Sequence, residues 1–281
     1  MRVNTNVSAL IANNQMGRNV SGQSKSMEKL SSGLRIKRAA DDAAGLAISE
    51  KMRAQLKGLD QAGRNVQDGI SVVQTAEGAL EETGNILTRM RTLAVQASNE
   101  TNSKDERAKI AGEMEQLRSE VDRIADSTKF NGENLLSSDK KIALQVGAEA
   151  VSNNVIEVSL INTKGVLTTR NVNSANIDAM SVSGSIGTEA ASKMIVNLDS
   201  SLADINSARA LLGAQQNRLE STQNNLNNTV ENVTAAESRI RDTDVASEMV
   251  NLSKMNILVQ ASQSMLSQAN QQPQGVLQLL G

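Results

Sequence analysis

The chain lacks the residues on which most enzyme and metal sites depend. Its 281 residues include no Cys, His, Trp or Tyr, with Phe130 as the single aromatic residue and Pro273 as the single proline. Without Cys there is no disulfide, no thiolate nucleophile and no cysteine-held metal. Without His the commonest general base is missing and a Ser-His-Asp triad cannot form. The composition therefore argues against an enzyme and implies no cofactor.

The charge balance and the scarcity of long apolar runs exclude further classes. Lys and Arg total 29 against 31 Asp and Glu, a net charge of -2, so no basic field attracts nucleic acid. Bases also need aromatic rings to stack on. The longest uncharged stretch, residues 255–281, is interleaved with Gln, Ser and Asn and is too polar to span a membrane. The first residues have no apolar signal-peptide segment. We expect a cytoplasmic chain, or one exported without a cleaved signal, that inserts into no membrane.

The remaining matches to catalytic or metal motifs are weak. Ser26-Met-Glu-Lys29 and Ser137-Ser-Asp-Lys140 fit a Ser-x-x-Lys pattern, but no accompanying motif follows either one. Asp41-Asp42 could form a carboxylate pair for a cation. No third ligand is nearby, however, and two acids at a helix start are favoured by capping and by the helix dipole. No catalytic residue and no metal ligand is predicted.

Apolar residues spaced by seven predict long helices. The chain's apolar residues are mostly Leu, Ile, Val, Met and Ala, which favour helix. The first run contains Leu59, Val66, Val73, Leu80, Leu87 and Ala94, and the second contains Leu198, Ile205, Leu212, Leu219, Leu226, Val233 and Ile240. A repeat of this length is typical of a coiled coil. Residues four positions further on, such as Gly63, Glu77 and Arg91, are not apolar. We therefore expect narrow seams that meet several neighbours.

Two helices are predicted in more detail. One extends from about Leu46 to Gln96, and the other carries Ile110, Met114, Leu117, Val121 and Ile124 at spacings of four and three. Gly63, Gly69, Gly78 and Gly84 lie inside the first. Each either costs about 1 kcal/mol of helix stability relative to Ala or permits close helix–helix approach. The sequence leaves both alternatives open.

The middle of the chain has a different pattern. Residues 142–146 and 156–160 alternate between apolar and other side chains, and a turn-rich stretch separates them. Runs of this kind predict a β-hairpin. From residue 162 to 187 no period persists, which indicates a loop or small irregular cap. The predicted fold class is mainly α: a long antiparallel helical coiled-coil rod with a small β-hairpin region.

The two chain ends look incomplete as independent structures. A polar break at Ser31–Arg38 and a register shift at Arg239–Asp244 mark where they join the rest. The predicted division is an assembly helix (1–40), a helical part with the hairpin near 141–161 (41–161), a short connector (162–187), a second helical part (188–239) and an assembly helix (240–281). The ends have too little apolar surface to fold alone, so we expect them to order against each other and against copies of the chain. The candidate assembly residues are Val3, Val7, Leu10, Met27, Leu30, Val245, Met249, Leu252, Val259 and Leu266.

Short sequence blocks near both chain ends carry a family resemblance. The N-terminal blocks are Leu30-Ser-Ser-Gly-Leu-Arg-Ile36, Ala40-Asp-Asp-Ala-Ala-Gly-Leu-Ala-Ile48, Gln61-Ala-Gly-Arg-Asn-Val-Gln-Asp-Gly-Ile70 and Gln74-Thr-Ala-Glu-Gly-Ala-Leu80. The C-terminal blocks are Leu212-Gly-Ala-Gln-Gln-Asn-Arg-Leu-Glu-Ser221, Ser238-Arg-Ile-Arg-Asp-Thr-Asp244 and Gln268-Ala-Asn-Gln-Gln-Pro-Gln-Gly-Val-Leu-Gln-Leu-Leu280. Together they cover roughly residues 1–160 and 190–281, in the family's order. The chain is identified as resembling a short flagellin in which the large outer domains are almost absent.

The resemblance implies a function and a set of partners. In the family, subunits self-assemble into the extracellular flagellar filament used for swimming, and the paired chain ends line its channel. The subunits are secreted by the flagellar type III apparatus, which needs no cleaved signal. A flagellin export chaperone binds the C-terminal segment, a cap complex inserts subunits at the tip, and hook-junction proteins lie at the filament base. These partners, and a homopolymer of flagellin subunits, are expected here.

The resemblance also implies a host receptor, Toll-like receptor 5. The matching segment is Leu87–Gln96, and Arg89, Leu93 and Glu113 match the contact residues of responsive members. The sequence departs from those members at Thr88, Met90 and Thr92, where Gln, Val and Glu are common. The alternative is that these residues only form the surface of the subunit.

Other functions remain open at the level of sequence. A hook-filament junction protein shares the ends more loosely, and it would form a short ring rather than a long fibre. A soluble signalling coiled coil is permitted by the Ala-rich heptads but is disfavoured by the predicted hairpin and by the missing membrane spans.

Overall fold

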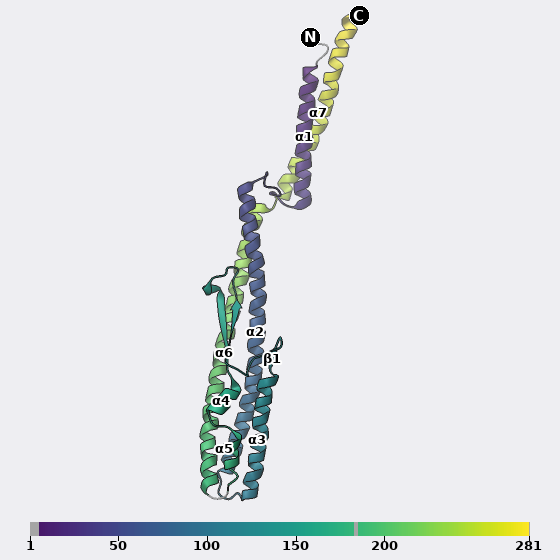
Figure 1. Cartoon of the computed structure of the whole chain (residues 1–281). Helices are drawn as coiled ribbons and strands as arrows, with labels where there is room; N and C mark the ends of the chain where they lie inside the picture. The colour runs from purple at the N-terminus through teal and green to yellow at the C-terminus, as the bar shows by residue number, and fades with distance from the viewer. Residues whose placement is uncertain (1–5, 183–184, 281) are drawn as a thin grey trace. The chain divides into compact units, whose positions relative to one another are not determined.

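The computed structural model describes residues 6–182 and 185–280, with side chains described up to Gln272 (Figure 1). The long helices are α1 (Val7–Ser32), α2 (Ala43–Ala97), α3 (Lys104–Ser127), α6 (Ser185–Arg241) and α7 (Val245–Leu280). The short elements are β1 (Lys129–Phe130), β2 (Glu133–Asn134), β3 (Lys140–Gln145), the 3-10 turn Ser152–Asn154, β4 (Val155–Leu160), α4 (Thr163–Thr169) and α5 (Ser174–Ala179). The predicted fold class, mainly α with a small β-hairpin region, is confirmed.

The chain forms two compact units. The first combines Met1–Leu56 with Glu231–Gly281, and the second is Lys57–Val230. The limits of these units fall inside α2 and α6. Two helices end within the predicted polar breaks: α1 ends at Ser32 and α6 ends at Arg241.

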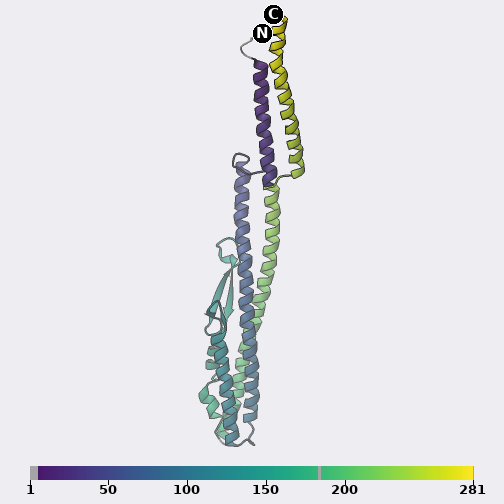
Figure 2. The same ribbon diagram turned by 90° about the vertical axis from the view of Figure 1, so that its right-hand side faces the viewer.

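The second unit is a bundle in which α3 and α6 both run antiparallel to α2. Arg89 of α2 pairs with Glu113 of α3, while Arg91 of α2 pairs with Asp199 of α6. Figure 2 shows the three helices side by side at the end of the unit that holds these pairs. One continuous apolar core runs from Leu59 to Leu226 and includes every member of the first heptad run.

The second row of seam positions in α2 differs from the expectation. The structure buries the residues three positions after each heptad residue, namely Ala62, Gly69, Ala76, Thr83, Met90 and Ala97. The positions four residues further on, such as Gly63, Glu77 and Arg91, are only half-buried. The seam of α2 is therefore lined with small residues and Met, and α2 meets α3, α6 and the hairpin in turn.

The hairpin packs on α2 through glycines. Strands β3 and β4 pair antiparallel from Lys140 opposite Leu160 to Gln145 opposite Val155. A Cβ at Gly69 would collide with the side chain of Leu144, and one at Gly58 would lie 2.8 Å from the Cβ of Ala148. The close-approach alternative therefore holds at Gly69, although the neighbour is a strand and not a helix. Among described atoms, nothing lies within 4 Å of a Cβ placed at Gly78 or Gly84.

Substitution of Gly84 and Gly69 by Ala should have opposite effects on stability. We expect Gly84→Ala to raise the free energy of unfolding by about 0.5–1 kcal/mol, because Ala restricts the unfolded chain and fits the helix. Gly69→Ala should lower it by about 1–3 kcal/mol, because the added methyl group displaces Leu144. Urea unfolding followed by far-UV circular dichroism measures both. Equal effects at the two positions would contradict the close packing of Leu144 against Gly69.

The segment expected to be irregular, 162–187, contains two short helices. Helices α4 and α5 have only seven and six residues, too few for a sequence period to emerge. Asn162 caps the start of α4 and Asn173 caps the start of α5. Leu167, Ile177 and other apolar side chains of this segment enter the core of the second unit. The connector is thus an ordered segment whose two short helices pack on α3.

Candidate assembly surface

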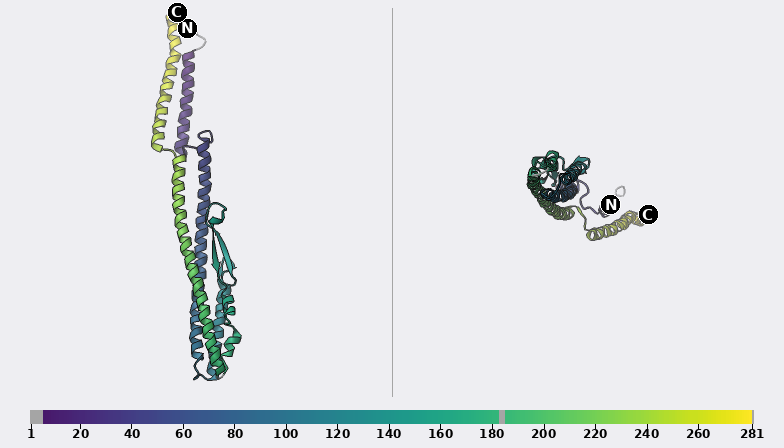
Figure 3. Two further views of the ribbon diagram at one scale, coloured as in Figure 1. Left: turned by 90° about the vertical axis from the view of Figure 1, so that its left-hand side faces the viewer. Right: turned by 90° about the horizontal axis from the view of Figure 1, so that it is seen from below.

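Helices α1 and α7 form an antiparallel pair in the first unit (Figures 1 and 3). The amide of Asn6 donates to the carbonyl oxygen of Ala269 over 2.7 Å, and the amide of Gln23 donates to Asn256 Oδ1 over 2.6 Å. Between them, Asn19 Nδ2 donates to Ser262 Oγ over 2.9 Å. Low numbers on one helix face high numbers on the other, so the two chain ends pair along their length.

The seam of this pair is polar and narrow. The buried residues of α1 are Asn19 and Ser26. Among the described side chains of α7, the buried one is Ser262. The half-buried positions beside them include Ala9, Ala12 and Gly22, where small side chains let the helices approach. A Cβ at Gly22 would lie 3.2 Å from Met255 Sδ. The pair therefore buries little apolar surface of its own.

The large apolar side chains of the pair point outward instead. They are 36–69% exposed: Val7, Leu10, Ile11, Val20 and Met27 on α1, and Val245, Met249, Val250, Ile257, Leu258 and Met265 on α7. Exposed apolar side chains in this number make the helix pair a candidate interaction surface. We call these residues the outward apolar set.

The predicted assembly residues separate into two groups. Val7, Leu10, Met27, Val245 and Met249 belong to the outward apolar set. Leu30, Leu252, Val259 and Leu266 are half-buried in the seam between α1 and α7. Val3 lies outside the described residues. The predicted residues therefore comprise some that pair the two ends and others that are exposed for a neighbour.

The turn after α1 is held by the chain just before α7. Gly33 ends α1 with a positive φ of 71°, and its carbonyl oxygen accepts from the N–H of Thr243 over 2.9 Å. The N–H of Arg35 donates to the carbonyl oxygen of Arg241 over 2.7 Å. Arg241 Nη1 lies 2.6 Å from Glu50 Oε1. A hydrogen bond from Arg241 holds the pKa of Glu50 below its usual value, against the opposing effect of desolvation.

Asp42 acts as a helix-start residue, as the capping interpretation predicted, whereas Asp41 closes the turn before the helix. Asp42 Oδ1 accepts from the N–H of Gly45 in the first turn of α2 over 2.9 Å. Asp41 Oδ2 accepts from the backbone N–H groups of Lys37 and Arg38. The hydrogen bond from Arg38 is the main cause that lowers the pKa of Asp41.

The predicted receptor residues lie on α2 and α3, but their side chains differ in solvent exposure. Arg89 Nη2 is 2.7 Å from Glu113 Oε1, and both side chains are about half exposed. Leu93 is only 3% exposed and belongs to the core of the second unit. Arg89 and Glu113 can therefore contact another protein directly, whereas Leu93 supports the helix from within.

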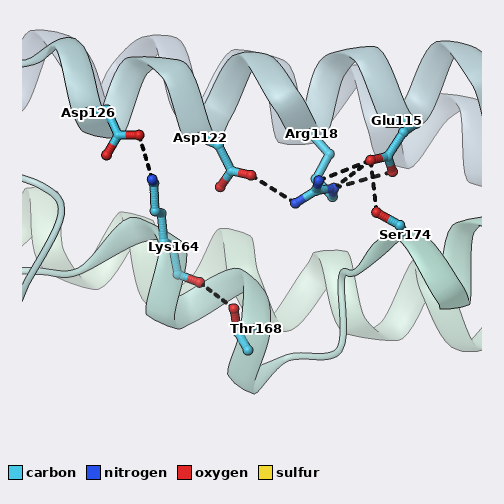
Figure 4. Close-up of polar contacts among 7 residues, drawn as sticks. All are labelled: Glu115, Arg118, Asp122, Asp126, Lys164, Thr168 and Ser174. Carbon is cyan, nitrogen blue, oxygen red and sulfur yellow. Dashed lines mark hydrogen bonds and ion pairs between the residues drawn. The ribbon is translucent and has the colours of Figure 1, made fainter.

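A polar cluster joins α3 to the short helices α4 and α5 (Figure 4). Arg118 contacts both Glu115 and Asp122 on its own helix, and Ser174 donates to Glu115 Oε1 over 2.8 Å. Desolvation raises the pKa of Glu115, but hydrogen bonds from Arg118 and Ser174 outweigh it and leave the pKa below its usual value. Lys164 Nζ lies 2.6 Å from Asp126 Oδ2. These contacts fix the connector to α3 and form no catalytic arrangement.

In the described residues, 6–182 and 185–280, no three His, Cys, Asp or Glu side chains gather where they could hold a metal ion. No helix in these ranges is long and apolar enough to cross a membrane.

Comparisons with known proteins identify the family. Residues 3–141 match the model of the bacterial flagellin N-terminal helical region, and residues 195–280 match that of the C-terminal helical region. The chain belongs to the bacterial flagellin family. It is 53% identical over 281 residues to a flagellin of Halalkalibacterium halodurans, covering all of both chains. It is 45% identical over 287 residues to the flagellar filament 31.3 kDa core protein of Treponema maltophilum, again covering both chains fully.

A solved structure shares the fold at low identity. The putative flagellar hook-associated protein from Vibrio parahaemolyticus superimposes with a TM-score of 0.63 at 13% identity, covering 72% of this chain and 100% of that one. This likeness shows the fold alone. The matches to flagellin at high identity decide against the junction protein and the signalling coiled coil.

Membership of the family settles the coarse function. The chain is a structural subunit of the extracellular flagellar filament, it polymerises with other flagellin subunits, and it is not an enzyme. The prediction of a structural protein is confirmed by this match.

Sequence reasoning missed part of the surface. Val250, Ile257 and Leu258 were not predicted because they lie off the heptad phase of Leu252 and Val259. Asn19 and Ser262 were missed because polar residues were not sought at seam positions. Asn19 lies three residues after Met16 and seven before Ser26, and Ser262 lies four before Leu266, so heptad spacing would have revealed both.

Proposed function

We propose that residues 1–40 and 240–281 build the filament as assembly helices, by burying the outward apolar set against neighbouring copies. The observation that carries this proposal is the burial pattern of the helix pair. Asn19, Ser26 and Ser262 are buried in the seam, aliphatic seam residues such as Leu252 and Val259 are only half-buried, and the outward apolar set is exposed. A pair of this kind is weakly stabilised on its own, because most helical stability in water comes from apolar packing. Neighbouring subunits supply that packing.

The same arrangement supports coupled folding and assembly. Burying one Ile, Val or Met side chain contributes about 1.5–3 kcal/mol, so each contact with a neighbouring copy adds stability that the isolated pair of ends lacks. In a monomer these residues stay in water. The ends therefore order fully when the subunit joins the filament.

We further propose that the export chaperone and the filament cap act on these ends. Residues 255–281 carry no charged side chain, and Ile257, Leu258 and Met265 are exposed along this stretch. A chaperone that covers this face before type III export keeps it from pairing early. The cap then places the released ends at the filament tip, and hook-junction proteins meet the same helices at the base.

Binding of Toll-like receptor 5 is a separate proposal on the second unit. The ion pair of Arg89 with Glu113 bridges α2 and α3 at the surface, and Thr88 and Thr92 are exposed beside it. A planar guanidinium held by a carboxylate offers directional hydrogen bonds to a partner. Leu93 acts in this proposal by keeping α2 in place.

A single substitution tests the assembly surface. We expect Ile257→Ser to raise the critical concentration for filament growth by about 30-fold, because losing roughly 2 kcal/mol of apolar burial per contact has that effect on an equilibrium. Ile257 is 66% exposed, so the change leaves the monomer intact. Sedimentation of seeded polymers at graded subunit concentrations measures it.

The matched control is Gln263→Ser, which shortens an exposed polar side chain on the same helix. It should polymerise like the unmodified chain. An Ile257→Ser chain that polymerises at an unchanged concentration would contradict the proposal.

A further inference from the structure

We infer that Asn19 and Ser262 determine the register in which α1 pairs with α7, and that they thereby align the outward apolar set for assembly. The inference rests on the proposed function, because it concerns the same pair of helices. It goes further by assigning a specificity role to two polar residues that carry no apolar surface.

The geometry singles out this pair. Asn19 is 6% exposed and Ser262 is 8% exposed, and both sit mid-way along the pair. Asn19 Nδ2 donates to Ser262 Oγ over 2.9 Å and also approaches the carbonyl oxygen of Leu258 at 3.4 Å. Asn19 Oδ1 accepts from Gln15 Nε2 over 3.4 Å. The Oδ1 contact lies within α1, so it is the Nδ2 contacts to α7 that depend on the register.

The apolar part of the seam selects the register poorly. A shift of α7 by one heptad still brings small and aliphatic residues together, because the seam repeats residues such as Leu252, Val259 and Leu266 at intervals of seven. Ala9, Ala12 and Gly22 accept almost any partner. Apolar packing alone therefore leaves neighbouring registers close in free energy.

Asn19 removes this degeneracy. In a one-heptad shift it would lie opposite Met255 or Ala269, and in neither case would it meet the hydroxyl group of Ser262. A buried amide without a partner disfavours the shifted states by roughly tenfold or more. A single buried Asn fixes the register of coiled coils in the same way.

Register matters because the outward apolar set lies on both helices. A one-heptad shift moves Ile257 and Met265 by about 10 Å relative to Val20 and Leu10 on α1, at 1.5 Å per residue. A neighbouring subunit that matches one arrangement would not match the other. The Asn19–Ser262 pair thus lowers the stability of the isolated helix pair but keeps the outward apolar set in one defined arrangement.

Engineered cysteines can report the register, because the chain has no Cys of its own. Gln23→Cys with Asn256→Cys reports the native register, since the Gln23 and Asn256 side chains are hydrogen-bonded at 2.6 Å. Gln23→Cys with Gln263→Cys, or with Met249→Cys, reports a shift by one heptad in either direction. Each full-length chain is assembled into filaments and oxidised with diamide, and crosslinked protein is quantified by gel electrophoresis.

The test compares these crosslinks in four backgrounds. In the unmodified background and in the control Asn14→Leu, an exposed position on α1, the native crosslink should exceed the shifted ones by about tenfold or more. In Asn19→Leu/Ser262→Ala the ratio should fall by about tenfold. The exchange Asn19→Ser/Ser262→Asn, which keeps the hydrogen bond, should restore it. If the Leu variant fails to assemble, the crosslink ratio of the exchange variant still tests the inference.

Two results would overturn the inference. One is an unchanged crosslink ratio in Asn19→Leu/Ser262→Ala, and the other is an exchange variant that slips as much as the Leu variant. If even the unmodified background gives no native crosslink in filaments, the pairing itself is absent and the proposed function fails with it.

Discussion

Deletion of residues 255–281 is expected to abolish filament formation and to leave the second unit folded. The deletion removes Val259 and Leu266 from the seam, and it removes Ile257, Leu258 and Met265 from the outward apolar set. With about 1.5–3 kcal/mol lost for each buried aliphatic side chain, no accessible subunit concentration restores growth. This is the largest effect on assembly that any change described here should have.

The second unit should survive the deletion because its core is separate. The apolar core extends from Leu59 to Leu226, and none of the described side chains of α7, up to Gln272, belongs to it. We expect the truncated chain to keep its helical circular dichroism signal from the second unit and to unfold cooperatively. Negative-stain electron microscopy of seeded, sulfate-treated protein measures assembly in parallel.

A matched control separates loss of apolar contacts from general damage to α7. Gln260→Ser/Gln263→Ser/Gln268→Ser changes only exposed polar side chains of the same segment, and it should still form long filaments. Filaments of normal length from the truncated chain would show that the C-terminal end is dispensable and that the assembly mechanism is wrong.

The sequence predicted the helices best where apolar spacing was sustained. The helix expected from Leu46 to Gln96 spans Ala43–Ala97, and the hairpin expected from alternation is β3 with β4. These elements follow from local patterns of period seven and period two, which the chain obeys over many residues. The short helices α4 and α5 gave no such pattern and depend on the contacts of Leu167 and Ile177 with the core.

The assembly surface was only partly predictable for a different physical reason. A heptad pattern identifies the residues between two helices, and it correctly marked Leu252 and Val259 as apolar seam positions. It cannot identify side chains that the helix pair leaves exposed, such as Ile257, which we propose to pack against another copy. Nor does it show that Leu93, carried over by resemblance as a contact residue, is inside the core. Burial is a property of the fold and is not visible in a motif.

The burial of Leu93 leads to a prediction about the receptor proposal. Leu93→Ala should lower the free energy of unfolding by about 2–5 kcal/mol, because it leaves a cavity beside α3 in a well-packed core. Arg89→Ala removes an exposed ion pair and should change stability by less than about 1 kcal/mol. Urea unfolding of the monomer, followed by circular dichroism, gives both values.

The two variants should also differ in how they affect receptor binding. Arg89→Ala removes a surface donor, so it should weaken binding of the fully folded protein to purified Toll-like receptor 5 ectodomain. Leu93→Ala should weaken binding only in proportion to the fraction of unfolded chain, and cooling or a stabilising osmolyte should restore it. Val95→Ala is the matched control, since Val95 lies on the same helix and is 49% exposed. If Leu93→Ala is as stable as the unmodified chain and still fails to bind, Leu93 contacts the receptor directly, and α2 must then rearrange to expose a side chain that the core now holds.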